Sequence, residues 1–490
     1  MNKAIFATIL CCFAFFTLAS GAVNFPYPQE ASYGYGTINT TSTTASADLK
    51  NKFSTFFTDF YEEGTCSNKF QGPCARIKHD TKSNTVSEGI GYGMIMAVYF
   101  SNETTSYQNQ FDKLWAYYQN WTNNKGVMNW KINGFSKVDA GGTNGATDAE
   151  FDVALALAMA HYQFGSTANK NYLDTAKALI AKIRQYEIDP NNLHRPGDGW
   201  NSERNPSYVS PAAFEIFKEV ESDQASKWES VISANYELLK KNQNSSSGVF
   251  SDWCNDNGGV TRGTFSYDAI RVPWRIAWAN AWYGHADAKT LLTNLFSKFL
   301  SGKNAADIKG SISLTGTMGN DKNSTFVGPL TNALSYNSAN QTQMDSFWNV
   351  LIGFKNEPYY SAALQIITGL LATGNMPNLK ALAEAPSSSS VPSSSSEEAP
   401  SSSSSSEDET PIVLPQIVHS NSLNAMQNSV NLQVVRNASL KVFDLKGNMV
   451  RSLKFTQGSY IVSLGDLPKG LYIVKAQFGS QKEILRIPVR

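Results

Sequence analysis

The sequence predicts a mainly α-helical domain followed by a small all-β domain. Apolar residues recur at helical spacing through most of residues 23–384, whereas residues 411–490 alternate apolar and polar positions as strands do. Residues 385–410 consist mainly of serine, with proline and acidic residues, and this composition cannot form a packed core. A chain of 490 residues is long enough for two domains joined by such a linker.

Residues 1–22 read as a secretory signal peptide. Lys3 is followed by the apolar run Ala4–Leu18 and by the small residues Ala19–Ala22, the pattern that precedes signal cleavage. This run is short for a membrane span, and no other uninterrupted apolar stretch approaches about 18 residues. We therefore expect an exported protein, secreted or held at the cell surface, with no membrane span.

Eleven segments of residues 23–384 have the length and periodicity of amphipathic or buried helices. They are Ala47–Glu62, Glu88–Phe100, Tyr107–Trp121, Ala146–Phe164, Asn171–Tyr186, Pro211–Val220, Ser226–Lys241, Tyr267–Tyr283, Ala286–Ser301, Ser338–Phe354 and Tyr360–Thr373. Long loops rich in glycine, asparagine, aspartate and tryptophan separate some of them, and loops of that length on a rigid scaffold usually carry function. Eleven or twelve helices with few strand signals favour stacked helical hairpins closed into a ring.

The C-terminal 80 residues have a different pattern of apolar and polar residues. Leu440–Leu445, Tyr460–Leu464 and Leu471–Ala476 alternate apolar and polar residues, with turn-forming residues between them, which predicts a small β-sandwich. This tail carries ten lysines and arginines against three acidic residues, whereas the linker carries five acidic residues. The whole chain has a net charge of zero, so its charge does not indicate binding to nucleic acid.

Three cysteines remain outside the signal segment. Cys66 and Cys74 are eight residues apart and could form a disulfide in an oxidising compartment, which leaves Cys254 unpaired. Three cysteines without clustered histidines argue against a zinc site.

Glu88 is a candidate general acid. It lies between glycines and apolar residues at a predicted helix start, and a carboxyl in a crowded apolar pocket tends to have a raised pKa. Such a group can stay protonated near neutral pH and donate its proton to a leaving group.

Two further carboxylates are candidates for its partners. Asp148 lies near the start of a helix of small residues, where the alternative is a simple helix cap. Asp268 and Arg271 are three apart, so on a helix they share a face, and an adjacent arginine favours the ionised carboxylate that a base requires. The alternative for this pair is an ordinary helix ion pair.

Five motifs in order make residues 24–376 resemble glycoside hydrolase family 8. They are SEGIGYGM (87–94), MNWKI (128–132), ATDAEFDVALALAMAHYQF (146–164), NPSYVSP (205–211) and SYDAIRVPWRI (266–276). The Ala-Thr-Asp element belongs to the family's signature region, and Glu150 stands where aspartate is more usual.

The resemblance implies a role for each carboxylate. Glu88 corresponds to the family's general acid, and Asp148 to the carboxylate that holds the sugar at the cleavage point. Asp268 falls where the subgroup with most cellulases and chitosanases keeps its general base, and Arg271 would orient it.

The resemblance also indicates substrate-binding residues. Tyr208 matches a tyrosine beside the cleavage subsite, and Trp130 is similar to a sugar-stacking platform. Trp200 and Trp253, on long loops, are further candidates for sugar stacking. Aromatic residues make up 12% of the chain, which suits either sugar binding or a large helical core.

The implied protein is an (α/α)6 barrel that hydrolyses a β-1,4-linked polysaccharide by internal, inverting attack, without metal or organic cofactor. Cellulose or another β-glucan is favoured as substrate, with xylan as the alternative. Chitosan fits less well, because residues 23–384 carry only 33 acidic against 30 basic residues. Two other readings remain open: a catalytically inactive carbohydrate-binding barrel, and a lyase of the same fold.

The tail resembles the C-terminal sorting domains of type IX secretion systems, through LKVFDLKGNMV (440–450) and GDLPKGLYIVKA (465–476). The alternative is a carbohydrate-binding sandwich. Such a domain would need exposed aromatic rings, but the tail has no tryptophan and only Tyr460 and Tyr472, both in predicted strands. We therefore expect contact with secretion machinery or surface attachment.

Overall fold

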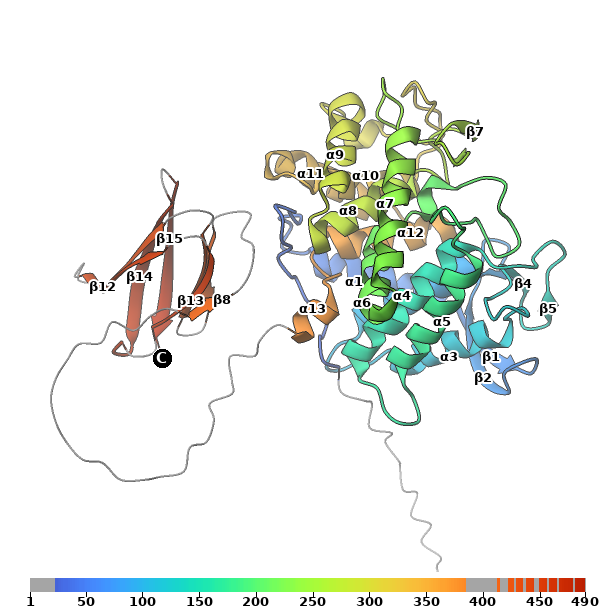
Figure 1. Cartoon of the computed structure of the whole chain (residues 1–490), viewed down its shortest axis with the longest axis horizontal. Helices are drawn as coiled ribbons and strands as arrows, with labels where there is room; N and C mark the ends of the chain where they lie inside the picture. The colour runs from blue at the N-terminus through green and yellow to red at the C-terminus, as the bar shows by residue number, and fades with distance from the viewer. Residues whose placement is uncertain are drawn as a thin grey trace, which may run out of the picture. The chain divides into compact units, whose positions relative to one another are not determined.

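The chain forms two compact units, one helical and one of β-strands (Figure 1). The computed structural model describes residues 23–384, 412–414, 422–426, 429–434, 438–444, 449–455, 458–464, 467–478 and 481–489. The predicted signal peptide and serine-rich linker lie outside the described residues.

Six helices form the inner wall of the helical unit. They are α2 (Ser87–Phe100), α4 (Thr147–Phe164), α6 (Pro211–Val220), α8 (Arg271–Tyr283), α10 (Ser324–Leu334) and α12 (Tyr359–Ala372). Each packs against the next in this order, and α12 packs back against α2, which closes the ring. Nearly every residue of α2, α4, α8 and α10 is buried, because these helices are covered on all sides.

Six more helices pack outside this ring. They are α1 (Ala45–Phe60), α3 (Gln108–Asn120), α5 (Tyr172–Tyr186), α7 (Ala225–Asn242), α9 (Ala286–Leu295) and α11 (Gln341–Gly353). Each contacts an inner helix that neighbours it in the ring and buries one face only; in α5 the buried positions are Tyr172, Ala176, Leu179, Ile180 and Ile183. The result is the predicted (α/α)6 arrangement.

Four helices differ clearly from the sequence prediction: α8, α10, α9, which ends at Leu295 rather than at Ser301, and the short α13 (Leu379–Glu384), which was not predicted. Helix α10 was not expected, because Gly328 and Pro329 interrupt its helical pattern. A Cβ at Gly328 would lie 2.3 Å from Thr368 Oγ1, so this glycine allows α10 to approach α12 closely. Helix α8 begins at Arg271 rather than at Tyr267, and residues 267–270 form a turn before it. Its Pro273 lies in the first turn, where a missing amide hydrogen bond costs nothing.

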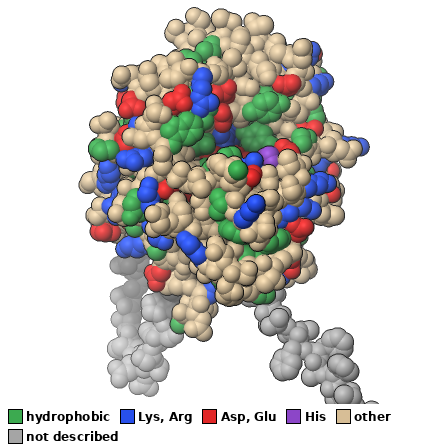
Figure 2. Space-filling view, turned by 90° about the vertical axis from the view of Figure 1, so that its right-hand side faces the viewer, with side chains coloured by type: hydrophobic (Ala, Val, Ile, Leu, Met, Phe, Trp, Pro, Cys, Tyr) green, Lys and Arg blue, Asp and Glu red, His purple; other side chains and the backbone are tan. Residues whose placement is uncertain are grey.

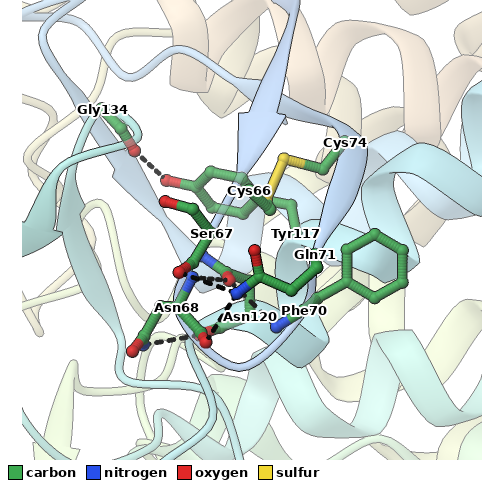
Figure 3. Close-up of a disulfide and its surroundings, with 9 residues drawn as sticks. All are labelled: Cys66, Ser67, Asn68, Phe70, Gln71, Cys74, Tyr117, Asn120 and Gly134. Carbon is green, nitrogen blue, oxygen red and sulfur yellow. Dashed lines mark hydrogen bonds between the residues drawn. A yellow bond between two sulfur atoms is a disulfide. The ribbon is translucent and has the colours of Figure 1, made fainter.

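The loops contain short strands that the sequence did not indicate. Strands β1 (Tyr61–Cys66) and β2 (Gly72–Ile77) form a hairpin closed by the Cys66–Cys74 disulfide (Figure 3). Asn120, at the end of α3, accepts hydrogen bonds from the amides of Asn68 (2.8 Å) and Phe70 (3.1 Å) and so ties the hairpin tip to the barrel. The third cysteine, Cys254, is free and buried.

Two other small sheets line the loops near the start of the inner helices. One contains β3 (Asn84–Val86), β4 (Lys131–Asn133) and β5 (Lys137–Val138), and the other pairs β6 (Trp253–Cys254) with β7 (Val260–Arg262). None of the described helices is long and apolar enough to cross a membrane.

The second unit is the predicted β-sandwich. Its two antiparallel sheets have the orders β8-β13-β10-β9 and β12-β11-β14-β15. The strands are β8 (Ile412–Leu414), β9 (Ser422–Met426), β10 (Ser429–Val434), β11 (Ala438–Phe443), β12 (Met449–Phe455), β13 (Gly458–Ser463), β14 (Gly470–Phe478) and β15 (Gln481–Val489). Val430 and Leu432 of one sheet share a buried core with Leu440, Val442 and Val474 of the other.

Candidate active site

A cavity of about 560 Å³ opens where all six inner helices begin. Its lining residues are His79, Asp80, Val86, Ser87, Glu88, Trp130, Ala146, Asp148, Tyr208, Tyr267, Asp268, Arg271, Asn323, Pro358, Tyr360 and Ser361. Figure 2 shows one face of the molecule with a hollow in it, where acidic, basic, hydrophobic and histidine side chains gather, the same kinds that line this cavity.

Arg271 joins three carboxylates at the floor of this cavity. It is the first residue of α8 and is almost fully buried. Its Nη1 donates to Glu88 Oε2 (2.8 Å) and Asp148 Oδ2 (2.7 Å), and its Nη2 donates to Asp268 Oδ1 (3.1 Å). One guanidinium therefore holds carboxylates from α2, from α4 and from the turn before α8.

Glu88 is the second residue of α2, and 16% of its side chain is exposed, at the cavity. Tyr359 donates its hydroxyl to Glu88 Oε1 at 3.1 Å. Burial raises the pKa of Glu88 to about 7, against the attraction of Arg271, and the negative charge of Asp148 raises it further. A glutamate in this setting holds a proton close to neutral pH.

Asp148 is the second residue of α4, after the N-cap residue Ala146, which makes no side-chain capping hydrogen bond. Its Oδ1 accepts from the amide of Ala149 (3.0 Å), and its Oδ2 is held by Arg271. Burial raises the pKa of Asp148, against the positive charges of Arg271 and Arg275. The carboxylate points into the cavity, which a simple cap does not require.

Asp268 lies in the turn before α8, where it still pairs with Arg271 three residues later. Its side chain is 37% exposed, the most accessible of the three carboxylates. Its second oxygen, Oδ2, accepts a hydrogen bond from the indole Nε1 of Trp253 at 3.0 Å.

The predicted aromatic residues separate into two groups. Trp130 and Tyr208 line the cavity, and the ring of Tyr208 lies 5.4 Å from the guanidinium carbon of Arg271. Trp200 and Trp253 are not among the lining residues: they stack on each other at 4.7 Å, with Trp200 exposed and Trp253 only 7% exposed.

Several lining residues were not predicted from the sequence. Tyr267 directly precedes Asp268 in the motif of residues 266–276, so the sequence could have indicated that it lines the cavity. Tyr360 is the second residue of α12. Only the closure of the ring of helices places it beside residues from the first half of the chain. No group of histidine, cysteine and acidic residues in the described ranges is arranged to hold a metal ion.

Hydrolysis of a glycosidic bond needs a carboxylic acid and a second carboxylate on either side of the bond, and the carboxyl groups and aromatic rings gathered at one end of this helical barrel suit that reaction. The chain belongs to glycosyl hydrolases family 8, whose family model matches residues 25–374. A second model, the secretion system C-terminal sorting domain, matches residues 424–490.

Known relatives agree with this membership. The chain is 32% identical over 382 residues to endoglucanase 2 of Ruminiclostridium josui, covering 75% of this chain and 81% of that protein. It is similar to the structure of a β-1,3-1,4-glucanase from Paenibacillus sp. X4, with a TM-score of 0.65, 26% identity and coverage of 72% and 99% of the two chains. A family 8 xylobiose complex from Teredinibacter turnerae shares the fold, with a TM-score of 0.58, 18% identity and coverage of 68% and 95%.

Proposed function

We propose that this glycoside hydrolase cleaves β-1,4-linked glucan internally and with inversion at the anomeric carbon. The observation that carries the proposal is the shared guanidinium of Arg271, which gathers Glu88, Asp148 and Asp268 at one cavity. In the proposal Glu88 is the general acid, Asp268 is the general base and Asp148 positions the sugar between them.

The environments of the two outer carboxyls support opposite roles. Glu88 is enclosed, and its raised pKa of about 7 keeps a proton available for the leaving oxygen. Asp268 is exposed enough for a water molecule to reach it, and two donors hold its oxygens. Asp268 would take a proton from that water as the water oxygen bonds to the anomeric carbon. At the same time the glycosidic bond breaks, and Glu88 gives its proton to the departing oxygen.

This mechanism needs space for water between Asp268 and the sugar. We therefore expect carboxyl groups about 6.5–9.5 Å apart when substrate is bound, rather than the roughly 5 Å of retaining enzymes.

The relatives support a β-glucan as substrate, because their names are endoglucanase and β-1,3-1,4-glucanase. Trp130 and Tyr267 are exposed at the cavity, where flat rings suit the faces of pyranose units. Xylan remains the second candidate, since the same fold holds xylobiose in the Teredinibacter protein.

The test is the release of reducing sugar from carboxymethyl-cellulose, lichenan, xylan and chitosan. Glu88→Gln should lose about 10²–10⁴-fold in kcat, because an amide cannot donate the acidic proton. Glu103→Gln, at an exposed position outside the cavity lining, is the matched control and should keep full activity. Full activity in Glu88→Gln would overturn the assignment, and proton NMR of the first product would report inversion or retention.

We further propose that the protein is exported by the predicted signal peptide and sorted by its tail. The match of residues 424–490 to a sorting domain supports the second step. Deleting those residues in a host with the cognate secretion system should retain the enzyme in the periplasm. Unchanged export of the truncated chain would contradict the role of the tail.

A further inference from the structure

Two adjacent residues, Asp252 and Trp253, hold Asp268 from two directions. Asp252 is buried, and its carboxylate binds the main chain of the loop that carries Asp268. Its Oδ1 accepts from the amides of Ser266 (3.2 Å), Asp268 (3.2 Å) and Ala269 (2.8 Å), and its Oδ2 from Thr264 (3.0 Å). These four amides lie in the loop before α8, where no helix supplies acceptors, so the one carboxylate satisfies main-chain donors of that loop.

The loop is shaped to wrap closely around Asp252. Gly263 has a φ of +77°, and a Cβ there would lie 2.5 Å from both Cβ and Oδ2 of Asp252. Only glycine combines this backbone conformation with so close an approach. The turn that presents Asp268 is therefore defined by its contact with Asp252.

Trp253 holds the side chain of Asp268. Its indole Nε1 donates to Asp268 Oδ2 at 3.0 Å, while Arg271 occupies Oδ1. The indole ring is itself fixed, stacked with Trp200 and lying 4.1 Å from the guanidinium carbon of Arg262. Arg262 in turn pairs with Glu203 at 3.2 Å. Because each oxygen keeps one donor, the carboxylate has a fixed plane and still accepts from water.

We propose that Asp252 and Trp253 are positioning residues that aim Asp268 at the attacking water, and that Trp253 acts through its N–H rather than as a sugar platform. The proposal rests on the proposed role of Asp268 as general base. It departs from the sequence expectation for Trp253, whose ring is 7% exposed and leaves little face for a sugar.

Trp253→Phe is the direct test, because it keeps an aromatic ring and removes only the donor. A hydrogen bond to a charged group is worth about 1.5–3 kcal/mol, so kcat should fall roughly 10- to 100-fold while KM changes less than about twofold.

Trp282→Phe is the matched control. Trp282 is 8% exposed, close to the 7% of Trp253, and its Nε1 donates a single hydrogen bond to the carbonyl of Met376, outside the cavity lining. This variant should lose a comparable amount of stability, measured by thermal unfolding, and keep the kcat and KM of the wild type.

A second variant covers the case in which Trp253→Phe does not fold. Asp252→Asn keeps the size of the side chain but replaces one accepting oxygen by a donor, so the Asp268 loop loses amide partners while Trp253 stays intact. We expect a fall in kcat of about tenfold or more, with KM unmoved.

Two results would overturn the proposal. A rise in KM in Trp253→Phe with kcat unchanged would assign this ring to sugar binding. A wild-type kcat in Asp252→Asn would show that the contact of Asp252 with the loop does not position Asp268. Asp268→Asn separates this failure from failure of the proposed function. If Asp268→Asn is inactive, Asp268 stays the proposed base and only the positioning by Asp252 and Trp253 is refuted. If Asp268→Asn is active, Asp268 is not the base and the proposed function itself is refuted.

Discussion

The pKa of Glu88 is set by two opposing effects, burial and contact with donors. Burial raises its pKa to about 7, while Arg271 and the hydroxyl of Tyr359 favour the charged form. In the proposed mechanism Glu88 acts only while protonated, so kcat/KM should decline as the pH rises through about 7. Because desolvation outweighs the ion pair with Arg271, the site can hold an acid beside an arginine.

Tyr359→Phe should move the decline of kcat/KM with rising pH, the alkaline limb of the pH profile, to higher pH. The variant removes the hydrogen bond that stabilises the Glu88 carboxylate, so the pKa of Glu88 should rise further. The measurement is kcat/KM against pH on a soluble β-glucan. Tyr99→Phe, which loses a buried hydroxyl contact to the Pro377 carbonyl outside the cavity lining, should leave the limb in place. A shift to lower pH in Tyr359→Phe would contradict this account.

At the scale of elements, the close approach of α2 and α4 places Glu88 beside Asp148. Gly91 makes this approach possible, since a Cβ there would lie 2.9 Å from Asp152 Cβ and 3.3 Å from the Ala149 carbonyl oxygen. Asp152 is itself locked to Arg275 of α8 by two hydrogen bonds of 2.5 and 2.8 Å, with both side chains buried. The helices of the inner wall therefore cannot move apart here to make room for a larger side chain.

Gly91→Ala should lower the free energy of unfolding by about 1–3 kcal/mol, because the added methyl overpacks a rigid contact between helices. Urea unfolding followed by circular dichroism measures the change. Gly353→Ala is the matched control: Gly353 lies in α11 with open space around its Cβ position, so alanine there should be neutral or stabilise by up to about 1 kcal/mol. Equal stability of the two variants would contradict the packing argument.

At the scale of the whole molecule, a buried pair of carboxyls limits stability at alkaline pH. Glu150 and Glu187 are fully buried beneath Gly145, where a Cβ would lie 3.3 Å and 2.8 Å from their respective oxygens. Burial raises the pKa of both groups far above the ordinary value, and nearby acidic side chains raise it further. The folded protein must therefore hold protons that the unfolded chain releases above about pH 4.3.

A raised folded pKa gives a stabilisation that is complete below the unfolded pKa and is lost as the pH rises toward the folded value. Glu187→Gln cannot ionise, so its melting temperature relative to wild type should increase from pH 5 to pH 9, by a few degrees at the alkaline end. Thermal unfolding at each pH measures this difference. The exposed Glu103→Gln should show no such trend, and a flat difference for Glu187→Gln would contradict the account.

Much of the fold was predictable because its signals are local. Helical periodicity located eleven segments, and their observed ends mostly differ by one or two residues. The alternation of the tail predicted its sandwich. Helix α10 was missed because Gly328 and Pro329 are poor helix formers, and only packing against α12 favours a glycine there.

The sequence alone determined the helical and β units, and its motifs and spacing made Glu88, Asp148, Asp268 and Arg271 candidates for the site. Tertiary structure decided what these residues touch, because the contacts join distant positions: Arg271 is 183 residues from Glu88 and 123 from Asp148. It also decided that Trp253, a candidate sugar platform, is buried and donates a hydrogen bond to Asp268, 15 residues away. Local pattern reports backbone conformation, whereas burial and hydrogen-bond partners exist only once the ring of helices has closed.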